Sequence, residues 1–215
     1  MLKLPGGRPI PEIPVLRSGV HRRAETVLLA ASLLRATVKV TNALKDASEK
    51  WAFGGDAGET VRGVKVNADH LEIVTTKAGT EEICTLLKEY VTLPPAELEK
   101  KLARDAFVES VTFPVYVKSH YAELDVDKVR VEVYGDMQYR VGEWEWGDPI
   151  DYEADYVIVV GAKVPTLPLW LKSQLHMGLG WYDRVELISD AVNRSRSGVL
   201  NASGLARSGL EAKPR

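Results

Sequence analysis

Apolar residues follow two different periods along this chain. In several segments they recur every three or four positions, with charged residues between them, which predicts amphipathic helices. Elsewhere they alternate with polar residues or form short β-branched runs, which predicts strands. The predicted helices cover residues 22–47, 80–90, 94–104, the segment from 168 to 177, and 182–192.

The predicted strands lie between these helices. They cover residues 51–53, 64–75 and a β-rich block over 108–160, in which 129–134 alternates clearly and 154–160 is continuously apolar. Helices and strands in this order indicate an α+β fold, with a mixed β-sheet and flanking helices. We expect an extended N-terminal arm over 1–20, one domain over 21–193, and a flexible tail over 194–215, where Gly, Ser and Arg show no period.

Composition narrows the class of protein. The net charge of −2 in 215 residues gives no overall field that would attract nucleic acid. The single cysteine, Cys84, excludes a disulfide framework and a cysteine-based zinc site, and suits a reducing, cytoplasmic location. The longest apolar run, residues 27–34, is too short to span a bilayer, so we expect no membrane anchor.

Three features carry the candidate chemistry. The strand at 51–53 ends in Gly54-Gly55, the strand at 64–75 carries His70 and Glu72 two positions apart, and the strand at 129–134 carries Glu132. Alternate residues of a strand point to the same face, about 7 Å apart along the backbone, so two such side chains can reach one cluster. Each feature alone is common in proteins, where such residues usually form turns or face water. Their combination is more informative.

The stretch GVKVNADHLEIVTTKAG, with the Gly-Gly turn before it, resembles the signature region of the nucleotidyltransferase superfamily, whose minimal members share the DNA polymerase β palm. In that family a strand ends in Gly-Gly or Gly-Ser, a helix follows, and the next strand carries an Asp-x-Asp or Asp-x-Glu pair. The corresponding positions are His70 and Glu72. The later stretch VRVEVYGDMQ is similar to the strand that supplies the third carboxylate, which is then Glu132. The resemblance covers about residues 36 to 192.

The resemblance implies a nucleotidyltransferase-like palm and a defined chemistry. A nucleoside monophosphate would pass from a nucleoside triphosphate to a hydroxyl, with Mg²⁺ or Mn²⁺ held by the acids. The glycine amides of Gly54 and Gly55 would approach the phosphates, because no side chain obstructs them. Arg62 and Lys65 are candidate phosphate contacts, and a solvated surface position explains them equally well.

This sequence departs from the family pattern at one position. His70 stands where the first aspartate is expected, and Mg²⁺ prefers oxygen to imidazole nitrogen. Asp69 could replace the missing acid if a bulge re-aimed it, since regular alternation sends it to the opposite face. His70, Glu72 and Glu132 could instead hold manganese or zinc, although loss of metal binding is the stronger alternative.

Three functions therefore stay open. The first is a metal-dependent nucleotidyltransferase with Glu72, Glu132 and His70 at its centre. The second is a catalytically degenerate protein of the same fold that binds a nucleotide or a partner chain, as an antitoxin-like or regulatory subunit would. The third is a structural α+β protein whose acids only face water. The sequence does not identify the acceptor, and it allows either a homodimer or a different partner protein.

Overall fold

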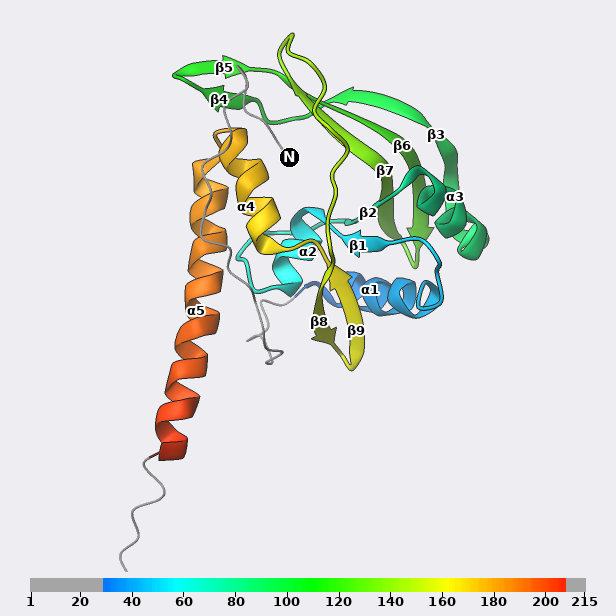
Figure 1. The fold of residues 1–215 in the computed structure, drawn as a ribbon. Helices are drawn as coiled ribbons and strands as arrows, with labels where there is room; N and C mark the ends of the chain where they lie inside the picture. The colour runs from blue at the N-terminus through cyan, green and yellow to red at the C-terminus, as the bar shows by residue number, and fades with distance from the viewer. Residues whose placement is uncertain (1–28, 208–215) are drawn as a thin grey trace, which may run out of the picture.

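The computed structural model describes residues 29–207, in which a seven-stranded sheet is the main element (Figure 1). Its strands follow the order β3-β6-β7-β2-β1-β9-β8. The strands β2 and β7 pair in parallel, as do β1 and β9, whereas the other neighbours are antiparallel. The sheet strands are β1 (Trp51–Phe53), β2 (Leu71–Thr75), β3 (Val91–Lys101), β6 (Val115–Val126), β7 (Val129–Val141), β8 (Asp155–Val159) and β9 (Ala162–Thr166). The prediction of an α+β fold with a mixed sheet is confirmed.

Helices cover both faces of this sheet. The helices are α1 (Ala31–Ala43), α2 (Gly55–Val61), α3 (Lys77–Leu86), α4 (Leu169–Gly178), α5 (Tyr182–Arg207) and the 3-10 helix η1 (Lys88–Tyr90), and β4 (Ala106–Val108) pairs with β5 (Val111–Phe113) in a separate hairpin. One core packs Val40 of α1 and Ile83 of α3 against Ile73 of β2. A second core packs Leu171 and Leu175 of α4 against the other face. The sheet therefore has an apolar core on each of its faces.

The segment predicted as a helix over 94–104 is a strand instead. Residues Val91–Lys101 form β3, which pairs antiparallel with β6 from Val91↔Leu124 to Lys101↔Tyr116. The segment Ala-Glu-Leu-Glu-Lys-Lys has high helix propensity, but strand formation depends mainly on what a segment pairs with. As an edge strand, β3 also tolerates Pro94 and Pro95, because an edge strand does not need every N–H for pairing.

Other boundaries also differ from the predictions. Of the strand predicted over 64–75, only Leu71–Thr75 is a strand, which is β2, and residues 64–70 form a loop. The helix predicted over 22–47 is described from Ala31 to Ala43, and the expected arm over 1–20 lies outside the described residues. The helix α5 continues to Arg207, so residues 194–207, expected to be part of a flexible tail, are helical. The period there was too weak to predict a helix.

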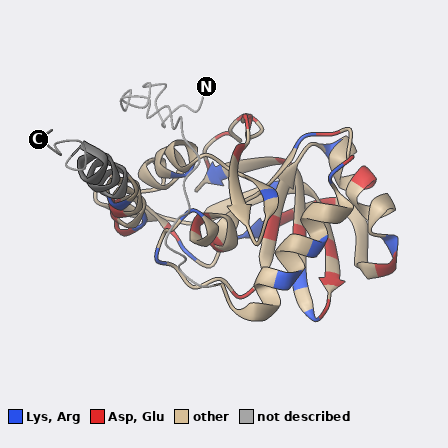
Figure 2. Ribbon diagram, turned by 90° about the horizontal axis from the view of Figure 1, so that it is seen from below, with Lys and Arg blue, Asp and Glu red and all other residues tan. Residues whose placement is uncertain are grey.

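Charge is distributed as the composition suggests. Lysine and arginine residues are interspersed with aspartate and glutamate over the described elements (Figure 2). Among the helices of residues 29–207, none combines the length and the apolar character needed to cross a membrane. Because positive and negative side chains are mixed in this way, any binding of a charged ligand must depend on a local cluster of side chains.

Candidate functional site

Glu72 and Glu132 lie side by side on neighbouring strands. They are direct partners in the parallel register of β2 and β7. On β7, a side chain at Gly135 would collide with Thr80 of α3, so Val131, Val133 and Gly135 face α3 and Glu132 points to the other face. Only 6% of the surface of Glu132 is exposed. The strand pairing therefore brings together the two acids that the sequence placed 60 residues apart.

The glycine pair lies directly against Glu72. The Gly54 N–H donates a hydrogen bond to the Glu72 carbonyl oxygen at 2.8 Å. Gly55 has φ +52°, a left-handed conformation that favours glycine, and an added Cβ would overlap the carboxylate of Glu72. A side chain at position 55 would thus displace this carboxylate. The Gly-Gly turn is needed here for close approach as well as for the turn itself.

His70 lies between the two carboxylates. Its Nε2 atom is 3.5 Å from Glu132 Oε2 and 3.6 Å from Glu72 Oε1, and its Nδ1 atom is 2.5 Å from Asp69 Oδ1. Ionised carboxylates beside both ring nitrogens favour the doubly protonated, cationic form of the ring. Hydrogen bonds to Glu132 and then to Glu72 raise the pKa of His70 to about 10.

Asp69 does not join the acid pair. It precedes β2, its side chain is 89% exposed, and its carboxylate contacts the outer nitrogen of His70. No bulge re-aims Asp69 toward Glu72 and Glu132, since β2 begins only at Leu71. The structure therefore does not place Asp69 where it could replace the missing acid. Asp69 instead holds the imidazolium from its solvent side.

Three further residues complete the cluster around Glu132. The Tyr134 hydroxyl donates a hydrogen bond to Glu132 Oε2 at 2.5 Å, and Lys100 Nζ donates to the Tyr134 oxygen at 2.8 Å. Arg130 Nη1 is 3.4 Å from Glu132 Oε1. Burial alone would raise the pKa of Glu132, but the hydrogen bonds from His70 and Tyr134 and the charge of Lys100 lower it to about 2. Glu132 is therefore ionised at neutral pH.

Sequence reasoning missed these three residues for different reasons. Arg130 and Tyr134 share the alternating face of Glu132 in the sequence, so that pattern could have identified them. Lys100 lies on β3, two strands away from β7 in the sheet order, in the segment predicted as a helix. Its contact with Tyr134 could not be inferred without the strand pairing.

Arg62 and Lys65 are not part of this cluster in the structure. The Arg62 guanidinium forms an ion pair with Asp155 at 3.0 Å and a hydrogen bond to Thr166 Oγ1 at 3.5 Å. It therefore connects the end of α2 to β8 and β9. Lys65 is exposed in the loop after α2. Their assignment as phosphate contacts stays a prediction.

A second buried charge cluster holds the C-terminal helices against α2. Glu59, 1% exposed, accepts a hydrogen bond from His176 Nε2 at 2.9 Å and is 3.2 Å from Lys172 Nζ, both on α4. Asp56 forms an ion pair with Arg184 of α5. Since α2 begins at Gly55, these contacts fix α4 and α5 beside the glycine turn. The sequence predicted the helices but not the pairing.

The residues of the site do not fit a metal ion as they stand. Glu72 and Glu132 offer the oxygen ligands that Mg²⁺ and Mn²⁺ prefer. A protonated imidazole cannot coordinate a metal, however, and its N–H points into the space between the two carboxylates. Among residues 29–207, no group of three or more His, Cys, Asp or Glu side chains is arranged to hold a metal ion. Loss of metal binding at the position of His70 stays a prediction.

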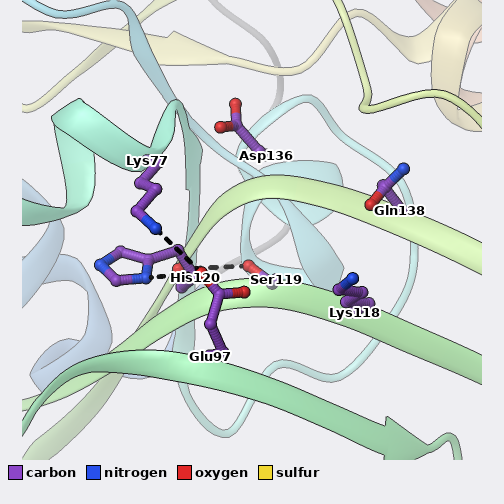
Figure 3. A pocket seen from close by; sticks show the side chains of 7 residues that line it. All are labelled: Lys77, Glu97, Lys118, Ser119, His120, Asp136 and Gln138. Atoms are coloured by element: carbon purple, nitrogen blue, oxygen red, sulfur yellow. Dashed lines mark hydrogen bonds and ion pairs between the residues drawn. The ribbon is translucent and has the colours of Figure 1, made fainter.

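A separate polar cavity of about 200 Å³ lies on the α3 face of the sheet (Figure 3). Within it, Glu97 contacts Lys77 at 3.0 Å and His120 Nδ1 at 3.3 Å, while His120 Nε2 is 2.8 Å from Glu81. The sheet separates this cavity from Glu72 and Glu132, so it is not part of the candidate site. Its lining residues are Lys77, Glu97, Lys118, Ser119, His120, Asp136 and Gln138.

Comparison with known proteins finds one matching family and several solved structures that resemble this chain. The profile of the aminoglycoside-2''-adenylyltransferase family matches residues 36–189. A crystal structure from Thermotoga maritima, described as a candidate nucleotidyltransferase, is 25% identical, with a TM-score of 0.57 over 78% of this chain and 96% of that one. No curated protein sequence matches the chain.

Two more distant structures resemble the chain over most of its length. The structure of ANT(2'')-Ia in complex with adenylyl-2''-tobramycin is 8% identical, with a TM-score of 0.41 over 81% of this chain and 98% of that one. An antigenic nucleotidyltransferase-like protein from Paracoccidioides brasiliensis is 11% identical, with a TM-score of 0.39 over 87% and 96%.

Proposed function

Because this chain belongs to the aminoglycoside-2''-adenylyltransferase family, we propose that it binds a nucleoside triphosphate beside Gly54-Gly55, Glu72 and Glu132. The observation that carries this proposal is the register of Glu72 with Glu132, with the backbone of Gly55 against the Glu72 carboxylate. The three sequence features thus lie together on the protein, which supports the proposal. The Gly54 N–H is already bonded to the Glu72 carbonyl oxygen, so the candidates for phosphate oxygens are the first-turn amides of α2 from Gly55 onward, where no side chain at Gly55 prevents close approach.

The charges around this site are compatible with an anionic ligand. Glu72 and Glu132 are neighboured by three cationic side chains, those of His70, Lys100 and Arg130. With Asp69 at the rim, three negative charges balance three positive charges. A triphosphate therefore does not meet an unopposed pair of carboxylates, which would repel it in the absence of a metal ion. His70, 21% exposed, lies within 4 Å of both acids.

The second candidate function is nucleotidyl transfer, which the same register of Glu72 and Glu132 favours. In this reaction a hydroxyl oxygen attacks the α-phosphorus, the bond from that phosphorus to the bridging oxygen breaks, pyrophosphate leaves and the hydroxyl proton is released. The family name indicates an aminoglycoside hydroxyl as the acceptor. Nucleotidyltransferases typically use divalent metal, Mg²⁺ or Mn²⁺. Because the cluster does not fit a metal, we rank binding above transfer.

The binding proposal is tested by isothermal titration of the full chain with ATP, GTP, CTP and UTP, with EDTA and then with Mg²⁺ or Mn²⁺. Gly55→Ala should weaken nucleotide affinity at least about tenfold, because the added Cβ displaces Glu72. Gly161→Ala is the matched control. It also replaces a glycine of positive φ, +82°, but its Cβ would meet no atom within 4 Å. Equal loss in both variants, or no binding by the wild type, would refute the proposal.

Transfer is tested separately with α-labelled ATP, an aminoglycoside and each metal. We expect no labelled product from the wild type, and labelled product from His70→Asp, which supplies an oxygen ligand at this position. Product from the wild type that Glu132→Gln abolishes would instead establish the second candidate. Nucleotide binding without product in either protein would support a binding protein.

A further inference from the structure

The two edges of the seven-stranded sheet differ in how they are protected against pairing with another strand. The edge strand β3 carries Pro94 and Pro95 and a run of charged residues from Glu97 to Lys101. Prolines and charges on an edge strand discourage pairing with a second chain. The other edge strand, β8, has neither proline nor lysine between Asp155 and Val159.

The outer surface of β8 is apolar and exposed. Tyr156 is 42% exposed and Ile158 is 61% exposed, and Val160 in the following turn is 74% exposed. The intervening residues, Val157 and Val159, pack against the main core. An edge strand also presents a row of backbone N–H and C=O groups that a further strand can pair with. The β8 edge, defined as Tyr156 to Val160, therefore combines a backbone template with an apolar face.

The turn after β8 contains a residue in an unfavourable backbone conformation. Val160 has φ +50°, a left-handed conformation in which β-branched residues are outliers, and glycine or asparagine is expected. Its exposed side chain lacks the core packing that usually explains a strained apolar residue. Such a conflict between local preference and structure is often found at functional positions. An apolar side chain at this tip is consistent with an interface that includes the hairpin.

We propose that β8 pairs antiparallel with β8 of a second copy of this chain, which joins the two sheets across a two-fold axis. The strand runs from Asp155 to Val159, so the axis would pass beside its midpoint, Val157. Tyr156 would then lie opposite Ile158 of the partner subunit, and Ile158 opposite the partner's Tyr156. Pairs of an aromatic and a β-branched residue are favourable across strands.

A second copy fits this edge better than a charged partner does. An isologous interface needs a patch that complements itself, and residues 156–160 carry no charge that would be buried without a partner. The only charged residue of the strand, Asp155, already forms an ion pair with Arg62 at 3.0 Å. Self-pairing therefore brings no like charges of β8 itself together, and Lys163 of β9 lies over the Tyr156 ring, with Nζ 4.1 Å from the ring centre. Strands β1 and β9 separate β8 from β2, so this inference does not depend on the nucleotide site.

The size of the proposed interface sets the expected strength of dimerisation. Five residues from each copy, with the exposed hairpin side chains, bury less than the roughly 1,600 Å² of a standard interface. We therefore expect a dissociation constant of about 1–100 µM. Sedimentation velocity on the full chain, from about 1 µM to about 1 mM, should show a concentration-dependent monomer–dimer equilibrium. A chain that stays monomeric at all concentrations would overturn the proposal.

A charge on the β8 edge tests its location. Ile158→Lys should weaken dimerisation at least about tenfold, because it would bury two ammonium groups opposite apolar side chains. Leu93→Lys is the control, since Leu93 is a comparably exposed residue, 44%, on the opposite edge strand. A dimer that survives Ile158→Lys, or that Leu93→Lys weakens equally, would overturn the assignment to β8.

A cross-link tests the register independently of charge. In a Cys84→Ser background, which removes the single native cysteine, Tyr156→Cys with Ile158→Cys places two thiols opposite two thiols across the axis. Mild oxidation should give a covalent dimer on a non-reducing gel, and either single variant should give much less. Equal cross-linking of the single and double variants would contradict the antiparallel register about Val157.

Discussion

Two buried glutamates of this protein contact the same kinds of side chain but lie in different electrostatic surroundings. Glu132 and Glu59 each meet a histidine and a lysine, at 3.5 Å and 3.9 Å for His70 and Lys100, and at 2.9 Å and 3.2 Å for His176 and Lys172. In both clusters the pKa of the glutamate is lowered to about 2, because hydrogen bonds to the carboxylate and the neighbouring positive charges outweigh burial.

The two histidines respond in opposite directions. His70 contacts three carboxylates, which raise its pKa to about 10. His176 is buried, contacts one carboxylate and has no hydrogen-bond partner for Nδ1, and burial lowers its pKa. The number of acids and the access to water therefore decide which histidine is a cation. Only His70 can neutralise an acid pair, whereas the charge opposite Glu59 comes from Lys172.

The largest expected effect is in the Glu59 cluster. Glu59→Ala leaves Lys172 without its acid in a site where it is only 13% exposed, so the free energy of unfolding should fall by about 3–5 kcal/mol. The pKa of Glu59 lies at about 2 in the folded protein, below its ordinary value of 4.5. The difference between wild type and variant should therefore shrink as the pH falls from 4.5 toward 2. Urea unfolding measures both effects, and a loss below about 1 kcal/mol would contradict them.

The contributions of His70 and His176 to the free energy of unfolding should depend on pH in opposite directions. The pKa of His70 is raised, so its contribution is present below pH 6.5 and is lost as the pH rises toward 10. His70→Gln should cost about 1.5–3 kcal/mol at pH 6 and less at pH 9. The pKa of His176 is lowered, so its contribution is lost as the pH falls below 6.5.

Unfolding curves of His70→Gln and His176→Gln at pH 6 and pH 9 test this contrast. Imidazole nitrogen shifts in NMR spectra supply a direct readout, with His70 protonated and His176 neutral at pH 7.5. An equal cost of His70→Gln at both pH values, or a neutral His70 at pH 7.5, would show that the acids do not hold this ring as a cation.

Glu132→Gln should have an intermediate effect. It removes the charge that faces His70 and Lys100, but Lys100 and Arg130 are 36% and 53% exposed and can turn to water. We therefore expect a loss of about 1–3 kcal/mol, smaller than that of Glu59→Ala. Guanidinium unfolding of the two variants in parallel compares them. A larger loss for Glu132→Gln would mean that exposure does not distinguish the clusters.

The smallest effect is expected at the rim of the His70 cluster. Asp69 contacts His70 Nδ1, but its side chain is 89% exposed and screened by solvent. Asp69→Asn should therefore change the free energy of unfolding by less than about 1 kcal/mol. Thermal unfolding at low and high salt tests this expectation. A loss as large as that of Glu132→Gln would place Asp69 among the main supports of the imidazolium.

Part of the site could be predicted because its signals are local. Alternation along a strand puts Glu132 in line with Arg130 and Tyr134, and a Gly-Gly turn after an apolar run indicates close backbone approach at Gly54 and Gly55. Lys100 and Glu59 could not be predicted in the same way. Lys100 lies in a segment whose composition favours a helix, and Glu59 contacts a helix, α4, more than 100 residues later in the sequence.

The sequence by itself determined the α+β class, the faces of the central strands and the glycine turn, because hydrophobic periodicity and backbone sterics act between near neighbours. Tertiary structure alone decided that β3 is a strand, that Glu72 and Glu132 are in register, and that His70 lies between them. Strand pairing and the charge state of a histidine depend on groups distant in the sequence. The electrostatic character of the site is therefore a property of the folded protein.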